Sequence, residues 1–372
     1  MPFRSKVGPS FEEPTVDNPS AGELWSCGDA KTQGLLGLGN TTDYSSPVQV
    51  GTATDWTQAG GGDKVSLAIR AGKLFSWGEG GNGYTGHGNT TDYSSPVQVG
   101  ALTGWTDFSC GRRATIGIES GKLFGWGGVN YGATGTGAGG HLSSPVQVGS
   151  ATGWTMVACN TDSSAGIQAG KLYTWGRASQ GEGGHGDTTD RATPVQVGAQ
   201  TDWLAIDMGT HGCFGVKTTG KLYAWGSNNS GASGLGNTTA YSSPVQVGSL
   251  TDWNSTGNRV AGNQCGMAIK TDGTFWAWGL SSYTPHGSTY SSPVQVGTDD
   301  NWVSLMFNGL GQGPIIRKAT GKLHVGGLNA NGQLGVGSTS TNFVQLGVLT
   351  TFRGFNGSAH MGNTHNFFIK SA

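Results

Sequence analysis

The sequence has little charge, little proline and no long hydrophobic run. Charged residues make up 12% of the 372 residues, and the formal net charge is −1. General nucleic-acid binding needs a surplus of Lys and Arg to neutralise phosphates, so this balance predicts none. No stretch approaches the roughly eighteen apolar residues of a membrane span, and the polar start, MPFRSKVGPSFEEP, is no signal peptide. We therefore expect a soluble protein with no membrane span.

Cysteine is sparse and follows no framework. The five Cys residues are scattered, and no Cys-x-x-Cys pair occurs. An odd, dispersed set in a chain of this length predicts neither disulfides nor a redox site. Cys110 and Cys159 each stand five residues after a Trp, so we expect small buried residues on inner strands.

Signatures of catalysis and of cofactor binding are also missing. The sequence contains no His-Glu-x-x-His, no Gly-x-Ser-x-Gly and no P-loop. His87 and His185 occupy related loop positions, but a metal site needs three or four convergent ligands, so we interpret them as structural. Asp43, Asp92 and Asp190 recur after Thr-Thr without the alternating acidic spacing of a calcium loop, which favours turn chemistry. We predict no catalytic residue, no metal and no cofactor.

Glycine is what the chain has in excess. There are 69 glycines but no Gly-x-y period, and thirteen Trp residues argue against disorder. Glycine supplies positive φ in tight turns, so this composition predicts many short strands joined by turns.

Three markers repeat in one phase along the chain. The first, Pro-Val-Gln-Val-Gly, recurs every 49 or 50 residues, beginning at Pro47, Pro96, Pro145, Pro194, Pro244 and Pro293, with a degenerate copy at Phe343–Gly347. The second is an aromatic at Trp56, Trp105, Trp154, Trp203, Trp253, Trp302 and Phe352. The third is Gly-Lys-Leu-aromatic leading to Trp77, Trp126, Trp175, Trp225 and Trp278, which we align with Cys27 and Val325 in the remaining copies. Seven copies in register define seven structural repeats.

Each repeat predicts four short strands and no helix. In the second copy the strands are Trp56–Gly60, Val65–Ile69, Lys73–Trp77 and Pro96–Val99. Four strands in a repeat of about fifty residues are typical of a propeller blade. The predicted fold is all-β, a seven-bladed β-propeller.

The two ends of the sequence complete one repeat. Asn366–Ala372 matches Ser66–Arg70, and Gly22–Gly28 matches Gly72–Gly78. One blade is therefore expected to take two strands from each end of the chain, which closes the ring and leaves no long open sheet edge. We predict a propeller domain over residues 22–372, preceded by an N-terminal arm over residues 1–21.

These motifs resemble the regulator of chromosome condensation repeat family. The likeness rests on the Gly-Lys-Leu segment, on Gly-x-Leu-Gly-x-Gly stretches such as Gly34–Gly39 and Gly332–Gly337, and on the Ser-Pro-x-x-Val strand. It covers about residues 22–372 and implies a seven-bladed propeller. It implies little about activity, because one fold hosts many functions.

The best-known member of that family is an exchange factor for a small GTPase that docks on chromatin. Its activity is associated with a wedge inserted in one blade and with a basic tail. Repeats of 49 or 50 residues leave no room for a wedge, and the arm balances Arg4 and Lys6 with Glu12 and Glu13. The family often has a His before the strand that precedes Gly-Lys-Leu, and only His365 falls there. Exchange activity is therefore not expected.

Variable turns are where binding specificity is expected. The aromatic column of Trp56 suggests a carbohydrate platform, but aromatics repeated in phase favour packing between blades. The turns between the first and second strands differ most, and we expect them to share one face of the ring. Their distinctive polar residues are the predicted binding set: Arg112, Arg113, Asp162, His211, Arg259, Gln264, Gln312 and His360.

The sequence favours a binding or structural module without catalytic activity. Low charge and near-verbatim repeats at Asn40 and Asn89 are similar to phage-encoded repeat proteins, which predicts a place on a virion, in a tail, fibre or capsid surface. The arm would dock on a larger assembly, and the ring would bind a protein or a cell-surface glycan. The first alternative is a regulator that uses one face, like an exchange factor or a hydrolase inhibitor. A weaker alternative is a propeller enzyme acting on glycans.

Overall fold

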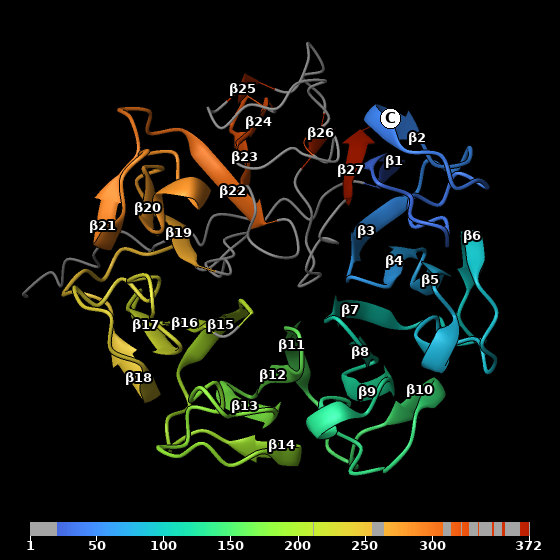
Figure 1. Cartoon of the computed structure of the whole chain (residues 1–372), viewed down its shortest axis with the longest axis horizontal. Coiled ribbons are helices and arrows are strands. Elements are labelled where there is room, and N and C mark those ends of the chain that lie inside the picture. The colour runs from blue at the N-terminus through green and yellow to red at the C-terminus, as the bar shows by residue number, and fades with distance from the viewer. Residues whose placement is uncertain are drawn as a thin grey trace, which may run out of the picture.

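The strands form a closed ring of seven blades around a central axis (Figure 1). A computed structural model describes residues 21–210, 212–254, 264–307, 314–320, 322–326, 334, 344–345, 352–353 and 365–371. We number the blades from the one that holds both chain ends. Within each blade we number the strands from the centre of the ring outwards.

Blades 2 to 5 each contain four antiparallel strands in chain order. Blade 2 contains β3 (Trp56–Gly61), β4 (Val65–Arg70), β5 (Lys73–Gly78) and β6 (Tyr93–Gln98). Blade 3 contains β7 (Trp105–Cys110), β8 (Ala114–Glu119), β9 (Lys122–Gly127) and β10 (Leu142–Gln147). Blade 4 contains β11 (Trp154–Cys159), β12 (Ser163–Gln168), β13 (Lys171–Gly176) and β14 (Arg191–Gln196). Blade 5 contains β15 (Trp203–Met208), β16 (Gly212–Lys217), β17 (Leu222–Gly226) and β18 (Tyr241–Gln246).

The remaining blades complete the ring. Blade 6 contains β19 (Cys265–Ile269), β20 (Phe275–Gly279) and β21 (Tyr290–Gln295), and a bridge from Trp253 to Lys270 marks its first strand. Blade 7 contains β22 (Trp302–Phe307), β23 (Pro314–Lys318), β24 (Leu323–Val325) and β25 (Val344–Gln345). Single 3-10 turns occur at η1 (Gly81–Gly83), η2 (Asn130–Gly132) and η3 (Ser281–Tyr283). No described helix is long and apolar enough to cross a membrane.

Blade 1 joins the two ends of the chain, as the sequence predicts. It contains β26 (Phe352–Arg353), β27 (His365–Ser371), β1 (Gly22–Gly28) and β2 (Tyr44–Gln49) in that order. β1 and β27 pair along their full length, from Gly22 opposite Ser371 to Gly28 opposite His365. The ring is thus closed by hydrogen bonds between its N-terminal and C-terminal strands.

The alignment of Val325 with the third-strand Trp is wrong by one residue. Val325 pairs with Val344 on the fourth strand, as Ser76 pairs with Val97 in blade 2. Gly326 therefore stands where the other blades have Trp. The motif is ambiguous here because this copy has two consecutive glycines, Gly326 and Gly327, and either can match the Gly that follows Trp in the other copies.

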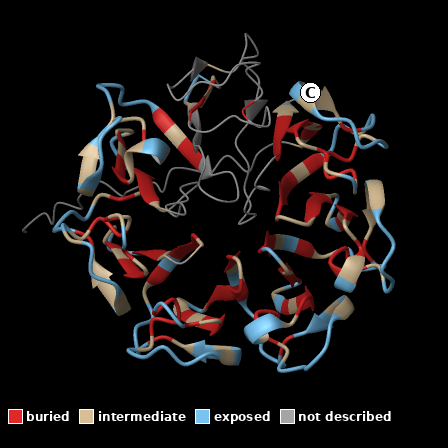
Figure 2. Ribbon diagram, viewed as in Figure 1, coloured by how far each residue is buried: buried red, intermediate tan, exposed pale blue. Residues whose placement is uncertain are grey.

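The buried residues lie within and between the blades (Figure 2). Many of the largest are Trp residues of two columns, one at the start of the first strands and one near the end of the third strands. Trp203, at the start of the first strand of blade 5, is 3% exposed and packs against Tyr223 and Trp225 with ring centroids 5.4 and 6.1 Å apart. The same arrangement recurs at Trp105 and Trp154. The packing interpretation of this column is confirmed.

In blades 2 to 6, the third-strand Trp connects the blade to the one before it. Trp175 Nε1 in blade 4 donates to the carbonyl of Ala133 in blade 3 at 2.9 Å. Gly135 lies against the same indole with φ of 74°, and a Cβ there would come within 2.8 Å of Nε1. The hydrogen bond recurs at Trp77, Trp126, Trp225 and Trp278. Glycine is required here both for its positive φ and for the close approach of the indole.

All five cysteines are buried, and none of them forms a disulfide. Cys110 and Cys159 end the innermost strands of blades 3 and 4, as expected. Burial raises the pKa of the Cys159 and Cys265 thiols to about 12. Neither is therefore a thiolate at neutral pH.

Candidate functional site

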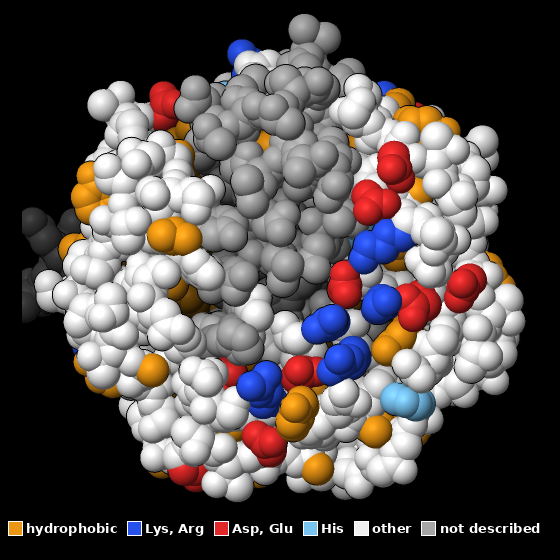
Figure 3. Space-filling model, viewed as in Figure 1, with side chains coloured by type: hydrophobic (Ala, Val, Ile, Leu, Met, Phe, Trp, Pro, Cys, Tyr) orange, Lys and Arg blue, Asp and Glu red, His pale blue; other side chains and the backbone are white. Residues whose placement is uncertain are grey.

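Charged side chains gather on one part of the ring face seen in Figure 3, over the blades of β1, β3, β7 and β11. This end of the ring carries the turns from first to second strand and the loops from third to fourth strand. Both connections open here because consecutive strands in a blade are antiparallel. We call the following residues the charged-turn face: Lys31, Asp63, Lys64, Glu79, Arg112, Arg113, Tyr131, Asp162 and Arg177.

Asp63 joins blades 1, 2 and 3. Its carboxylate accepts a hydrogen bond from Lys31 Nζ at 2.8 Å and lies 3.7 Å from Arg112 Nε. Burial alone would raise the pKa of Asp63, but the hydrogen bond from Lys31 and the charges of Lys31, Lys64 and Arg112 lower it overall. Beside it, Lys64 donates to Glu79 at 2.8 Å, and this hydrogen bond raises the pKa of Lys64.

Asp162 joins blades 3 and 4. Its side chain is 8% exposed and lies 3.3 Å from Arg113 Nη1. Its backbone NH and that of Ser163 donate to Asn160 Oδ1, which fixes the turn. Its carbonyl accepts a hydrogen bond from the backbone NH of Arg177. The ion pair is therefore held in place by backbone contacts on both sides.

Tyr131 and Arg177 extend this surface outwards. The Arg177 guanidinium lies 5.5 Å from the centre of the Tyr131 ring, and its Nε donates to Ser179 Oγ at 2.7 Å. Tyr131 is 49% exposed and has φ of 55°. A bulky residue in the left-handed region is uncommon, and such strain is concentrated at functional sites.

Half of the predicted binding set lies among the described residues. Arg112, Arg113 and Asp162 belong to the charged-turn face. Gln264 lies in blade 6, where its carbonyl accepts from the Leu280 backbone NH. The other four, His211, Arg259, Gln312 and His360, lie outside the described residues.

The sequence prediction missed two cations of the charged-turn face, Lys31 and Arg177. Both lie in loops that follow third strands, whereas the predicted binding set is confined to turns that follow first strands. Because neighbouring strands in a blade are antiparallel, the turn after the first strand and the loop after the third strand lie at the same end. The order of the predicted strands therefore already indicates that these loops lie beside the predicted binding turns.

The Asp and His residues for which the sequence predicts structural roles make hydrogen-bond contacts within the loops and strands. Asp43, Asp92 and Asp190 each accept a hydrogen bond from a backbone NH at the start of their own loop, at 2.8 to 2.9 Å. His87 and His185 lie 2.9 Å from the hydroxyls of Ser76 and Thr174, and burial lowers the pKa of both. Within the described ranges, no three His, Cys, Asp or Glu residues are placed to hold a metal.

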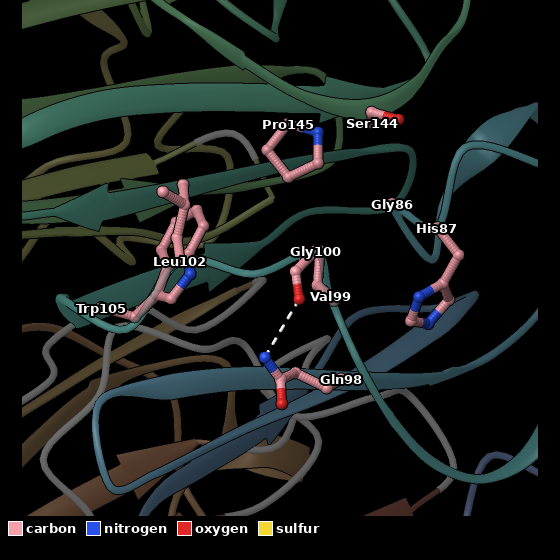
Figure 4. A pocket seen from close by; sticks show the side chains of 9 residues that line it. All are labelled: Gly86, His87, Gln98, Val99, Gly100, Leu102, Trp105, Ser144 and Pro145. Atoms are coloured by element: carbon pink, nitrogen blue, oxygen red, sulfur yellow. Dashed lines mark hydrogen bonds between the residues drawn. The ribbon is translucent and has the colours of Figure 1, made fainter.

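A shallow cleft of about 420 Å³ lies on the outer rim between blades 2 and 3. Trp105 and Leu102 form one end and His87 the other, while Pro145 lies opposite Gln98 and Gly100 (Figure 4). Gln98 Nε2 donates to the Gly100 carbonyl at 3.0 Å. His87 is the one titratable side chain among the residues that line it, so the cleft lacks a pair of groups for acid–base chemistry.

Three segments match the model of the regulator of chromosome condensation (RCC1) repeat, at residues 21–69, 71–118 and 219–269. The chain therefore carries repeats that match this family's model. A search of curated proteins finds no significant match by sequence.

Three solved structures align over nearly the whole chain. Human WBSCR16 aligns over 95% of this chain and 99% of its own, with a TM-score of 0.79 and 17% identity. Prp20p from Saccharomyces cerevisiae aligns over 95% of this chain and 93% of its own, at 0.78 and 15%. Yeast RCC1 (Prp20) bound to Kap60 aligns over 100% of this chain and 96% of its own, at 0.77 and 15%. At these identities the likeness establishes the fold and not a shared partner.

Proposed function

We propose that this RCC1-type propeller is a non-enzymatic module that binds a protein through the charged-turn face. The observation that carries the proposal is a series of ion pairs, in which Asp63 contacts Lys31 and Arg112, and Asp162 contacts Arg113, the residue next to Arg112. It crosses four blades at one end of the ring. Charged side chains held by several partners pay little entropy on binding and steer a complementary partner.

Relatives with the same fold support the class of function. The Prp20p structure is reported with its binding to Gsp1p and histones, and a second structure holds yeast RCC1 with Kap60. Those partners are proteins, which favours a protein partner over a glycan for this chain. A regulator acting through one face agrees with this support, whether it resembles an exchange factor or a hydrolase inhibitor.

A place on a virion stays a prediction from composition. Its docking element would be the arm, and residues 1–20 lie outside the described part of the chain. A glycan-cleaving activity is the remaining alternative. The cleft near Trp105 does not favour it, because that cleft has a single titratable group.

A comparison of captured proteins tests the proposal. The full chain is immobilised and exposed to lysate of its host, beside an Arg112→Ala/Arg113→Ala variant. The matched control is Lys73→Ala/Lys122→Ala, which removes two exposed cations from the start of the third strands, at the other end of blades 2 and 3. We expect a protein captured by the unmodified chain and the control and lost with the arginine variant. Identical capture by all three would refute binding at the charged-turn face.

A further inference from the structure

Two arginines of the charged-turn face, Arg112 and Arg177, can bind carboxylates beyond those of the face itself. Asp63 is shared between Lys31 at 2.8 Å and Arg112 at 3.7 Å. The Lys31 contact is a short hydrogen bond, whereas the Arg112 side chain is 53% exposed. Arg112 therefore keeps most of its capacity to bind another carboxylate.

Arg177 is the second arginine with unused capacity. Its Nε donates to a neutral hydroxyl, Ser179 Oγ, and its guanidinium lies over the Tyr131 ring. Among the described residues, no Asp or Glu forms a salt bridge with it. Between Arg112 and Arg177, Arg113 is neutralised by Asp162. The surface thus presents two guanidinium groups with unused capacity together with one neutral ion pair.

Tyr131 adds an exposed aromatic ring to this surface. The equivalent residue of blade 2 is Asn82, with φ of 58°. Asn tolerates the left-handed region, whereas Tyr does not. Blade 3 therefore has the less favourable residue for its backbone at the position where an aromatic ring is half exposed beside an arginine. Tyr and Arg are the residues enriched at binding hot spots.

We propose that the surface formed by Arg112, Tyr131 and Arg177 binds an acidic segment of the partner protein. The inference rests on the proposed function and specifies the chemistry of the partner. Each guanidinium offers parallel N–H donors that match a carboxylate. Acidic side chains of the segment pair with Arg112 and Arg177, and its apolar atoms pack on the Tyr131 ring. The low overall charge, −1, limits general attraction of polyanions, so the selectivity is local.

Fluorescence anisotropy with defined peptides tests the proposal. The probe is a short labelled Glu-Gly repeat, and the reference is the matched Gln-Gly repeat. We expect the full chain to bind the Glu peptide and not the Gln peptide, with affinity that falls as salt is raised. Arg112→Gln/Arg177→Gln should weaken binding by about tenfold or more, because two charge-assisted contacts are lost. Lys73→Gln/Lys122→Gln should bind as the unmodified chain does.

Tyr131→Asn separates a binding role from a structural one. Asn fits the positive φ, so the melting temperature should not fall, while affinity for the Glu peptide should. A variant that binds as tightly as the unmodified chain would remove Tyr131 from the proposal.

Three results would overturn the inference. These are equal binding of the Glu and Gln peptides, no effect of the double arginine variant, and displacement of the Glu peptide by a stoichiometric single-stranded oligonucleotide. The proposed function fails separately, because it depends on whether capture of a host protein is lost with Arg112→Ala/Arg113→Ala. A captured protein that is lost with that variant, combined with no preference for the Glu peptide, would refute the inference alone.

Discussion

Replacing Gly135 by alanine tests the contact that joins neighbouring blades. Gly135 has φ of 74°, and an added Cβ would lie 2.8 Å from Trp175 Nε1 and 3.1 Å from Cε2. The indole cannot move away freely, because its Nε1 donates to the Ala133 carbonyl at 2.9 Å. Two costs therefore combine, a backbone cost and a packing cost.

Gly149→Ala provides the matched control for the backbone cost. Gly149 has φ of 61°, and nothing lies within 4 Å of an added Cβ. The free energy of unfolding of Gly149→Ala should fall only by the cost of placing Ala in left-handed backbone, about 1–2 kcal/mol. That of Gly135→Ala should fall by the same amount plus about 1–3 kcal/mol, because the added Cβ overpacks against the indole. The difference between the variants measures the contact between blades.

The assay is thermal unfolding of both variants followed by circular dichroism. For 372 residues, 1 kcal/mol shifts the Tm by about 1.3 °C, from the specific entropy of unfolding. The Tm of Gly135→Ala should therefore lie about 1–4 °C below that of Gly149→Ala. Equal Tm values would show that the indole gives way without cost and would refute the reasoning. A lower Tm for Gly149→Ala would do the same.

Two further variants test the hydrogen bonding of the core. Trp175→Phe removes the hydrogen bond to Ala133. Trp154→Phe removes an indole N–H that has no partner in the described structure. Trp175→Phe should therefore lower the free energy of unfolding by at least about 1 kcal/mol more than Trp154→Phe, measured as the difference in Tm. Equal losses would contradict this. Burial, with the charge of a nearby lysine, lowers the pKa of His365 to about 3. In the unfolded chain the pKa of this His is about 6.5. As the pH falls, His365 is therefore protonated in the unfolded chain before it is protonated in the folded one. Stability should therefore drop between pH 6.5 and 3, by up to about 1.4 kcal/mol per unit. His365→Val, which installs the residue found at Val65, should flatten the dependence of Tm on pH, and an unchanged slope would refute the assignment.

The sequence predicts much of the fold because the repeats constrain one another. Three markers in phase, each present in seven copies, indicate the number of blades, and the match between Gly22–Gly28 and the third strand predicts the closure that the structure shows. The one misalignment, at Val325, occurred where the repeat is most degenerate. A single residue of register is decided there by strand pairing and not by motif.

The candidate site was less accessible to the same reasoning. Arg112, Arg113 and Asp162 stood out because the turns of neighbouring repeats differ at these positions. Lys31 and Arg177 did not, because glycine-rich loops of this kind predict ordinary turns. Periodicity identifies what every blade shares, whereas a binding surface depends on residues that occur once.

The sequence alone determined the ring, its split blade, the buried Trp columns and the glycine turns, because each follows from a local pattern repeated in every copy. Only the tertiary structure decided which charges meet. Lys31 and Asp63 are 32 residues apart and Arg113 and Asp162 are 49 apart, yet each pair lies in adjacent blades at the same end of the ring. Such pairing depends on the side chains that face each other across a blade boundary, and no single repeat contains both partners.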